Sequence, residues 1–280
     1  MSKPTAALRR LAAFTDDPAG GNPAGVWITD ELPSDDEMQR IATEVGYSET
    51  AFLTAVDERR YRIRYFSPLA EVSFCGHATI AAGVSLGDAA GEGTYRLETS
   101  VGEVPVLVTV QDGRTTAALT SVTPTHKPVS PDLLAEVMAA MGIAPEQLDA
   151  QIPPVLAWAG AWHLILSVSE RGTLAAMDYH FERLKAAMQE ANLTTVQYIH
   201  RDATGLFHAR NPFPVGGVVE DPATGAAAAA LGGYLRDAGL ISAPTTFRIH
   251  QGDDMGRPSR LDVAVPVVGG ITVSGGAVAI

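Results

Sequence analysis

The chain has 280 residues, 46% apolar and 19% charged, which is typical of a folded globular protein rather than a disordered or fibrous one. Its formal net charge of -12, with no Lys/Arg-rich run, argues against nucleic acid as a partner. The single cysteine, Cys75, excludes an intramolecular disulfide and a cysteine-based zinc site. No apolar run approaches the ~18 residues of a membrane span, so we expect a cytoplasmic protein without a membrane partner.

The first half of the chain predicts a helix, two strands and a second helix, in that order. The segment SDDEMQRIATEV over 34–45 begins with a capping-box pattern and places apolar residues on one helical face. AFLTAV and YRIRYF follow as strands, and the small-residue segment FCGHATIAAGVSLGD predicts a helix that begins near Gly76. Ala and Gly offer no polar face, so we expect this helix to be buried on all sides.

The second half repeats this order. TGAAAAALGGYLRD lies 149 residues after CGHATIAAGVSLGD, and six of the fourteen positions agree, Gly76 with Gly225 among them. An offset of 146 aligns the preceding helix and strands and places Thr195 opposite Glu49. Such a repeat predicts two similar α+β domains, each a curled, mostly antiparallel sheet around a central helix, with a site that draws residues from both.

The proline-containing segment SVTPTHKPVSP over 121–131 separates the two halves, because its prolines disfavour regular structure. We expect an N-terminal domain over 1–123 and a C-terminal domain over 131–269. The last strand, about 270–280, is expected to return to the first domain.

The starts of the two buried helices are candidate anion sites. Unpaired N–H groups and the positive end of the helix dipole favour a carboxylate there, and glycine at Gly76 and Gly225 lets a ligand approach the backbone. We expect Asp221 to precede the second helix immediately, with Pro222 in its first turn, so Asp221 is either the N-cap or a functional carboxylate. His77 is either structural or a proton shuttle. The sequence lacks GxGxxG, P-loop, HExxH and paired-cysteine patterns, so we expect neither a cofactor nor a metal site.

Five segments in order resemble the phenazine-biosynthesis PhzF family and span nearly the whole chain. They are AAFTDDPAGGNPAGV, MQRIATEVGYSETAFL, YRIRYFSPLAEVSFCGHATIAAG, VVEDPATGAAAAALGGYL and HQGDDMGRPS. The resemblance implies a fold similar to diaminopimelate epimerase, a homodimer and catalysis without a cofactor.

The resemblance also implies roles for individual residues. Glu49 matches the family's acid/base glutamate, and His77 and Asp221 match its other catalytic motifs. Substrate contacts are implied for Gly76, Thr224, Gly225, Ala226 and Cys75. The chain departs from the family in carrying Ala226 where a serine is common, and FCGHA in place of FAGHP.

The sequence therefore predicts an isomerase that moves a proton on a small anionic, carboxylated metabolite, with Glu49 as the proton-transfer group. One alternative is an epimerase or dehydratase that uses Cys75 as its only base, since Cys75 and Thr224 match the positions of the two cysteines of the epimerase relatives. Another alternative is a non-catalytic protein that binds a small carboxylate.

Overall fold

The computed structural model describes residues 7–280, and the chain divides into two compact units. The N-terminal unit comprises the described residues up to Thr120 together with Ser274–Ile280, and the C-terminal unit comprises Ser121–Val273. Residues 1–6, with which the expected first domain begins, lie outside the described residues. No helix over residues 7–280 is long and apolar enough to cross a membrane.

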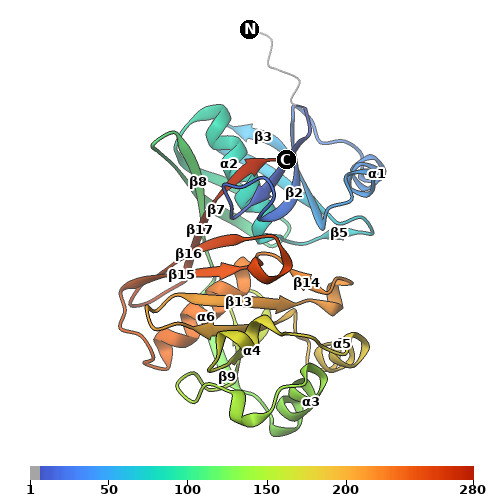
Figure 1. The fold of residues 1–280 in the computed structure, drawn as a ribbon. Helices are drawn as coiled ribbons and strands as arrows, with labels where there is room; N and C mark the ends of the chain where they lie inside the picture. Colours follow the sequence, from blue (N-terminus) through green and yellow to red (C-terminus); the bar gives the residue numbers. More distant parts are fainter. Residues whose placement is uncertain (1–6) are drawn as a thin grey trace. The chain divides into compact units, whose positions relative to one another are not determined.

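The strands of the N-terminal unit close into a ring (Figure 1). Each is hydrogen-bonded to the next in the order β1, β2, β3, β4, β6, β7, β8 and β17, and β17 pairs again with β1. The β2–β3 and β4–β6 pairs are parallel. The bounds are β1 (Arg9–Ala13), β2 (Asn22–Thr29), β3 (Glu49–Asp57), β4 (Arg60–Phe66), β6 (Gly93–Thr99), β7 (Gly102–Gln111), β8 (Arg114–Thr120) and β17 (Thr272–Ala279), with the short β5 (Glu71–Val72) beside β4.

Helix α2 (Gly76–Ala90) lies inside this ring, where it contacts β1, β2, β3, β7 and β8. Every residue from His77 to Gly87 is buried, as the small-residue pattern predicts. Gly87 is required by close packing, since an added Cβ would lie 2.4 Å from Cγ1 of Val108 and 2.6 Å from Cγ2 of Thr115. The small side chains of α2 thus let the sheet curl tightly around it.

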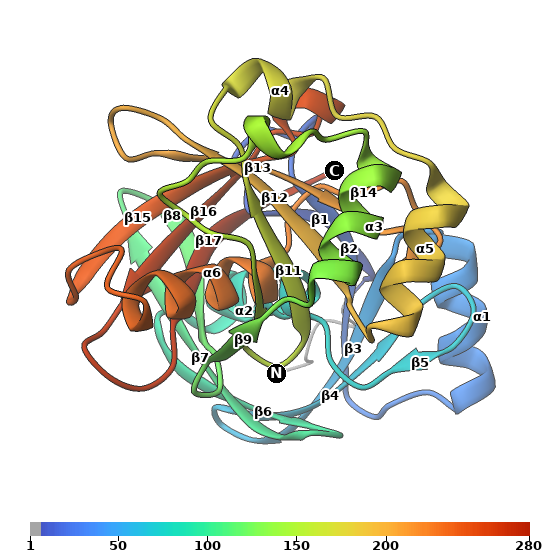
Figure 2. The ribbon, with the colours of Figure 1, turned by 90° about the horizontal axis from the view of Figure 1, so that it is seen from below.

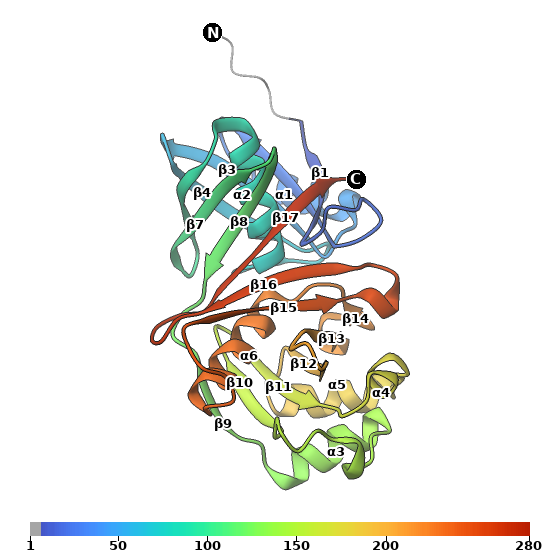
Figure 3. The same ribbon diagram turned by 60° about the vertical axis from the view of Figure 1, so that its left-hand side comes forward.

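The C-terminal unit repeats this plan. Its strands pair in the order β9, β10, β11, β12, β13, β15 and β16, and the parallel pairs β11–β12 and β13–β15 correspond to β2–β3 and β4–β6. Helix α6 (Gly225–Asp237) is buried against β9, β10, β11 and β16, and the β15–β16 hairpin runs beside it (Figure 3). The bounds are β9 (Thr125–Pro128), β10 (Val155–Trp158), β11 (Trp162–Ser167), β12 (Thr195–Arg201), β13 (Phe207–Pro212), β14 (Glu220–Asp221), β15 (Thr245–Gln251) and β16 (Ser259–Val265).

Amphipathic helices cover the outer faces of both sheets. In the N-terminal unit α1 (Asp35–Val45) packs Met38 and Ile41 against Phe52 and Phe66. In the C-terminal unit α3 (Pro131–Met141) and α5 (Phe181–Glu190) lie side by side (Figure 2) and share a core with the outward side chains of β11 and β12. The remaining helical segments are α4 (Arg171–Ala175), η1 (Pro145–Gln147), η2 (Pro214–Gly216) and η3 (Asp253–Met255).

The predicted fold class is confirmed: each unit is a mostly antiparallel sheet curled around one buried helix. The helix predicted over 34–45 begins as expected, because Ser34 Oγ accepts a hydrogen bond from the Glu37 N–H. The Glu37 carboxylate accepts from Arg40 rather than closing the capping box.

The separating segment over 121–131 was wrongly predicted to lack regular structure, because it contains β9. Pro128 ends that strand, which pairs on one side with β10 and therefore tolerates the missing N–H.

Candidate active site

The start of α2 brings together the predicted residues of the N-terminal unit. Gly46 ends α1 in the left-handed conformation, with φ of 72°, and the chain turns back so that Glu49 is the first residue of β3. Cys75 is the N-cap of α2, and His77 is the second residue of that helix. We call Glu49, Cys75 and His77 the Glu49 cluster.

The three side chains of the Glu49 cluster are in mutual contact. Cys75 Sγ lies 3.4 Å from Glu49 Oε2 and 3.3 Å from His77 Nδ1, and His77 Nε2 lies 3.5 Å from the same Glu49 oxygen. The side chain of Glu49 is 19% exposed and that of His77 is 8% exposed. The carboxylate thus lies against two neighbours, while part of it remains exposed.

The number of protons available decides which group donates and which accepts in each of these contacts. A thiol carries one proton, so if Cys75 donates to Glu49, the contact between Cys75 and His77 uses the N–H at Nδ1 of the imidazole. Nε2 of His77 then accepts from the hydroxyl of Ser48, whose Oγ lies 3.3 Å away. In this order the donors run Ser48, His77 and Cys75 and end on the Glu49 carboxylate.

The backbone at the start of α2 is open to a ligand. A Cβ added to Gly76 would meet no atom within 4 Å. The first N–H groups of a helix have no partner within it and carry the positive end of the helix dipole. The start of α2 beside Glu49 thus has the room and the donors that an anionic group requires.

The start of α6 holds a second polar group, Asp221, Thr224 and Gln251, which we call the Asp221 cluster. Thr224 Oγ1 donates to Asp221 Oδ2 at 2.5 Å. The fully buried amide of Gln251 donates to Thr224 Oγ1 at 3.0 Å and to the Asp221 carbonyl at 2.7 Å, and it accepts from the Thr224 N–H at 3.1 Å. Gln251 therefore fixes the turn that carries both residues into α6.

The N-cap reading of Asp221 is wrong, because Thr224 is the N-cap of α6 and Pro222 lies before the helix. Gly225 and Ala226 are its first two residues, so Ala226 occupies the position that His77 has in α2. Sequence reasoning missed Gln251. The alternation of apolar residues at 247 and 249 places residue 251 on the inner face of β15, and a polar residue there indicates a specific partner.

A buried polar network stands where the first unit has Glu49. Thr195, the first residue of β12, contacts His163 Nδ1 at 2.8 Å and accepts from Asn211 Nδ2 at 3.3 Å. Asn211 also donates to Gln197 Oε1 at 2.8 Å, and all four side chains are buried. The carboxylate of the first unit is thus replaced by neutral groups in the second.

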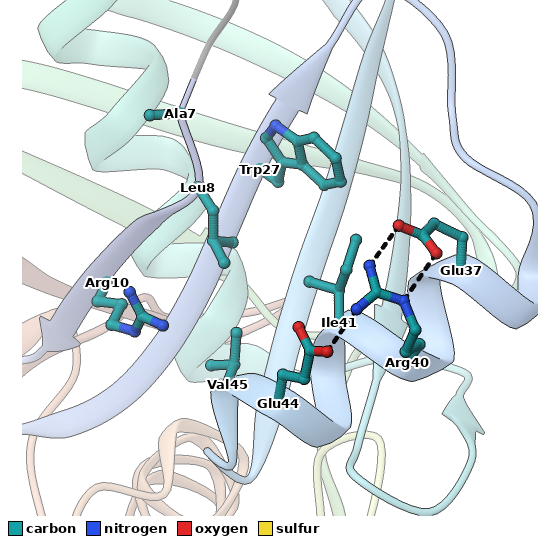
Figure 4. Close-up of a pocket in the computed structure, with 9 residues that line it drawn as sticks. All are labelled: Ala7, Leu8, Arg10, Trp27, Glu37, Arg40, Ile41, Glu44 and Val45. Atoms are coloured by element: carbon teal, nitrogen blue, oxygen red, sulfur yellow. Dashed lines mark hydrogen bonds and ion pairs between the residues drawn. The ribbon is translucent and has the colours of Figure 1, made fainter.

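A separate hollow lies on the outer side of the N-terminal unit, between α1 and the strands β1 and β2 (Figure 4). Leu8, Trp27 and Ile41 form its apolar part, and Arg40 bridges Glu37 and Glu44 at its rim. None of the predicted site residues lines it.

Comparison with known proteins agrees with this architecture. The family model for phenazine biosynthesis-like proteins matches residues 11–280. The chain belongs to this PhzF family. A Bacillus subtilis member named "Uncharacterized isomerase YfhB" is 31% identical over 95% of this chain and 92% of its own. The trans-2,3-dihydro-3-hydroxyanthranilate isomerase of Pseudomonas aeruginosa is 31% identical over 90% of this chain and 87% of its own.

Solved structures show the same family fold. A PhzF-family protein of Bacillus anthracis matches with a TM-score of 0.87 and 26% identity, over 98% of this chain and 96% of that one. A structure described as a "probable proline racemase" from Agrobacterium radiobacter matches at 15% identity with a TM-score of 0.67, over 98% of this chain and 90% of that one, which is a likeness of fold alone. With its relatives named as isomerases, this PhzF-family chain is an isomerase.

Proposed function

We propose that this isomerase moves a proton on a small carboxylated metabolite without a cofactor, and that Glu49 carries the proton. The observation that supports this most is the Glu49 cluster, in which a partly exposed carboxylate accepts from Cys75 beside the open start of α2. A positioned acid/base group of this kind contributes about 10²–10⁴-fold in rate.

The proposed reaction is a 1,3-shift. Glu49 removes a proton from a carbon next to a C=C bond, and the electron pair forms a new C=C bond. The old double-bond pair moves to its far carbon, which takes the proton back from the Glu49 carboxylic acid. Atoms and electrons balance, and neither oxidant nor reductant is consumed.

Substrate binding is proposed to rest on backbone and hydroxyl donors. The N–H groups at the start of α2, with Gly76 giving room, would hold a carboxylate or an oxyanion. For the C-terminal unit by itself, we assign the Asp221 cluster and the start of α6 at Gly225 and Ala226 to the binding of a small carboxylated ligand. The name of the Pseudomonas relative motivates cyclic dienyl carboxylates as the first substrates to test.

A second candidate is proton transfer by Cys75, which is favoured by the 3.3 Å contact between its Sγ and His77 Nδ1. An imidazole at this distance can take the thiol proton and leave a thiolate base. The non-catalytic alternative predicts ligand binding without proton exchange.

The test is proton NMR in D₂O with cyclic dienyl carboxylates and small amino and hydroxy acids. We expect the wild type to place deuterium at one carbon of a substrate, and Glu49→Gln to bind that substrate without exchange. Glu44→Gln, which changes an exposed carboxylate of α1, is the matched control and should exchange at the wild-type rate. Exchange by Glu49→Gln at the wild-type rate would overturn the role of Glu49, and binding without exchange by the wild type would favour a binding protein.

A further inference from the structure

Three histidines form a row across neighbouring strands of the C-terminal unit. His200 on β12 pairs with His208 on β13, which pairs with His250 on β15. Directly paired residues project from the same face of a sheet. The ring centroids accordingly lie 6.3 Å apart for the first pair and 5.7 Å apart for the second.

Two aspartates lie at the ends of these strands. Asp253, in η3, places Oδ2 at 3.8 Å from Nδ1 of His250, which is too long for a hydrogen bond. Asp202 places Oδ2 at 3.5 Å from Nε2 of His208. The ligand atoms of His208, His250 and Asp253 all lie within 4.8 Å of one another.

His208 has an unused nitrogen. Its Nδ1 is buried and has no hydrogen-bond partner, whereas its Nε2 is directed toward Asp202. An imidazole that donates one N–H to a carboxylate carries its lone pair on the other nitrogen, which is the arrangement typical of metal-binding histidines. A buried lone pair with no partner carries a desolvation cost that a bound cation would remove.

We propose that His208, His250 and Asp253 bind a divalent transition-metal ion of the zinc class. Two imidazoles and one carboxylate are a ligand set that zinc accepts, with metal–ligand distances of about 2.0–2.2 Å. Such distances hold ligand atoms ~3.4 Å apart in a tetrahedral site, so the three groups, which lie within 4.8 Å of one another, would have to move closer on binding the ion. Asp202 orients the His208 ring through its contact with Nε2, on the side away from the proposed ligand atom Nδ1.

The surrounding charges permit this site. Arg260 donates to Asp253 Oδ1 at 2.7 Å, on the other oxygen from the one near His250. Arg248 is paired with Asp262, so its charge is largely balanced.

The site would act on the Asp221 cluster through the backbone. His250 and Asp253 flank Gln251, whose amide holds Thr224 and Asp221. A metal ion that joins β13, β15 and η3 would fix this strand end, independently of the proton transfer assigned to Glu49.

The first test is calorimetric titration of the full chain with Zn²⁺ alone. We expect the wild type to bind, and His208→Gln and His250→Gln to lose this binding event. Asp202→Asn should weaken binding about 10–100-fold, as loss of a carboxylate behind a ligating histidine does. His200→Gln is the matched control, since His200 lies in the same row but places Nδ1 at 3.1 Å from the Val168 carbonyl, and it should bind as the wild type does.

The Glu49 cluster could also hold a metal ion, so a second measurement separates the two sites. Co²⁺ bound by Cys75 gives a thiolate-to-cobalt charge-transfer band, whereas the proposed site gives only the weaker d–d bands of nitrogen and oxygen ligation. The NMR signals of the imidazole protons of the wild type provide a readout without mutation. The signals of His208 and His250 should shift on addition of Zn²⁺, whereas that of His126 should not. Unshifted signals, or undiminished binding in both folded glutamine variants, would overturn the proposal.

Discussion

Cys75 Sγ lies 3.4 Å from Glu49 Oε2, so the thiol and the carboxylate of the candidate active site share a proton position. The two candidate bases are therefore in contact. His77 contacts both, at 3.3 Å from the sulfur and 3.5 Å from the carboxylate oxygen. Assigning the base requires substitutions that remove each group separately.

Cys75→Ala should lower the rate of substrate proton exchange by no more than about tenfold, because Glu49 and His77 remain in contact. Glu49→Gln should lower it by at least about 10², the usual contribution of an acid/base group. Initial exchange rates by NMR at saturating substrate compare the two. Cys75→Ser, which keeps a hydrogen-bond donor to Glu49, is the control. A greater loss of exchange rate in both Cys75 variants than in Glu49→Gln would show that the thiol is the base.

Gln251→Leu should raise KM more than it lowers kcat. The substitution keeps the volume but removes the bonds to Thr224 and Asp221, leaving buried polar groups unsatisfied at a cost of about 1–3 kcal/mol. Steady-state kinetics and urea unfolding measure the two effects. Thr224→Val removes only the hydroxyl and should be milder in both, so an unchanged KM in Gln251→Leu would refute a positioning role.

Arg210→Met should strongly destabilise the C-terminal unit. Arg210 and Glu220 form a bidentate pair with side chains only 11% and 3% exposed, and removing one partner of such a pair costs about 3–5 kcal/mol. The exposed pair of Arg248 with Asp262, at 53% and 50%, is the control, for which Arg248→Met should cost about 0–1 kcal/mol. Equal shifts of the urea midpoint in the two variants would contradict this account.

Burial lowers the pKa of His163 to about 3, and this predicts a pH dependence of stability. An unfolded histidine titrates near 6.5, so the unfolded chain takes up a proton that the folded chain excludes as pH falls from about 6.5 toward 3. Above that window His163 is neutral in both states and does not make stability depend on pH. Within the window, the free energy of unfolding should fall by up to about 1.4 kcal/mol for each pH unit by which the pH is lowered.

His163→Asn keeps a polar atom near Thr195 but cannot take up this proton. Unfolding curves in urea at pH values from 7 to 5 should therefore show a smaller loss of stability with falling pH in the variant than in the wild type. Parallel losses in the two proteins would argue against a neutral buried His163.

The sequence allowed prediction of the elements whose signals are local or repeated. Ser34 marks the start of α1, and the run of Ala and Gly predicts the burial of α2 and α6 because small residues permit close packing on all sides. The contacts among Glu49, Cys75 and His77 depend on how β3 meets α2, which local patterns do not specify.

The histidine row shows the limit of such patterns most clearly. His208 and His250 stand 42 residues apart, on strands that are neighbours only because α6 crosses between them. The histidines are therefore far apart in the sequence, and their alignment depends on the register of the β13–β15 pair. The role of Gln251 escaped prediction for a related reason, since its partners belong to a turn 30 residues earlier.

The ring around α2 is completed by β17, which follows the whole C-terminal unit in the sequence and pairs with both β1 and β8. On the ribosome, the N-terminal unit therefore waits for Ser274–Ile280, which are synthesised after the whole of Ser121–Val273. We expect the second unit to fold first during translation, although it is made second. A nascent chain that ends before residue 272 would hold a gap between β1 and β8, with unpaired strand edges that invite association with other chains.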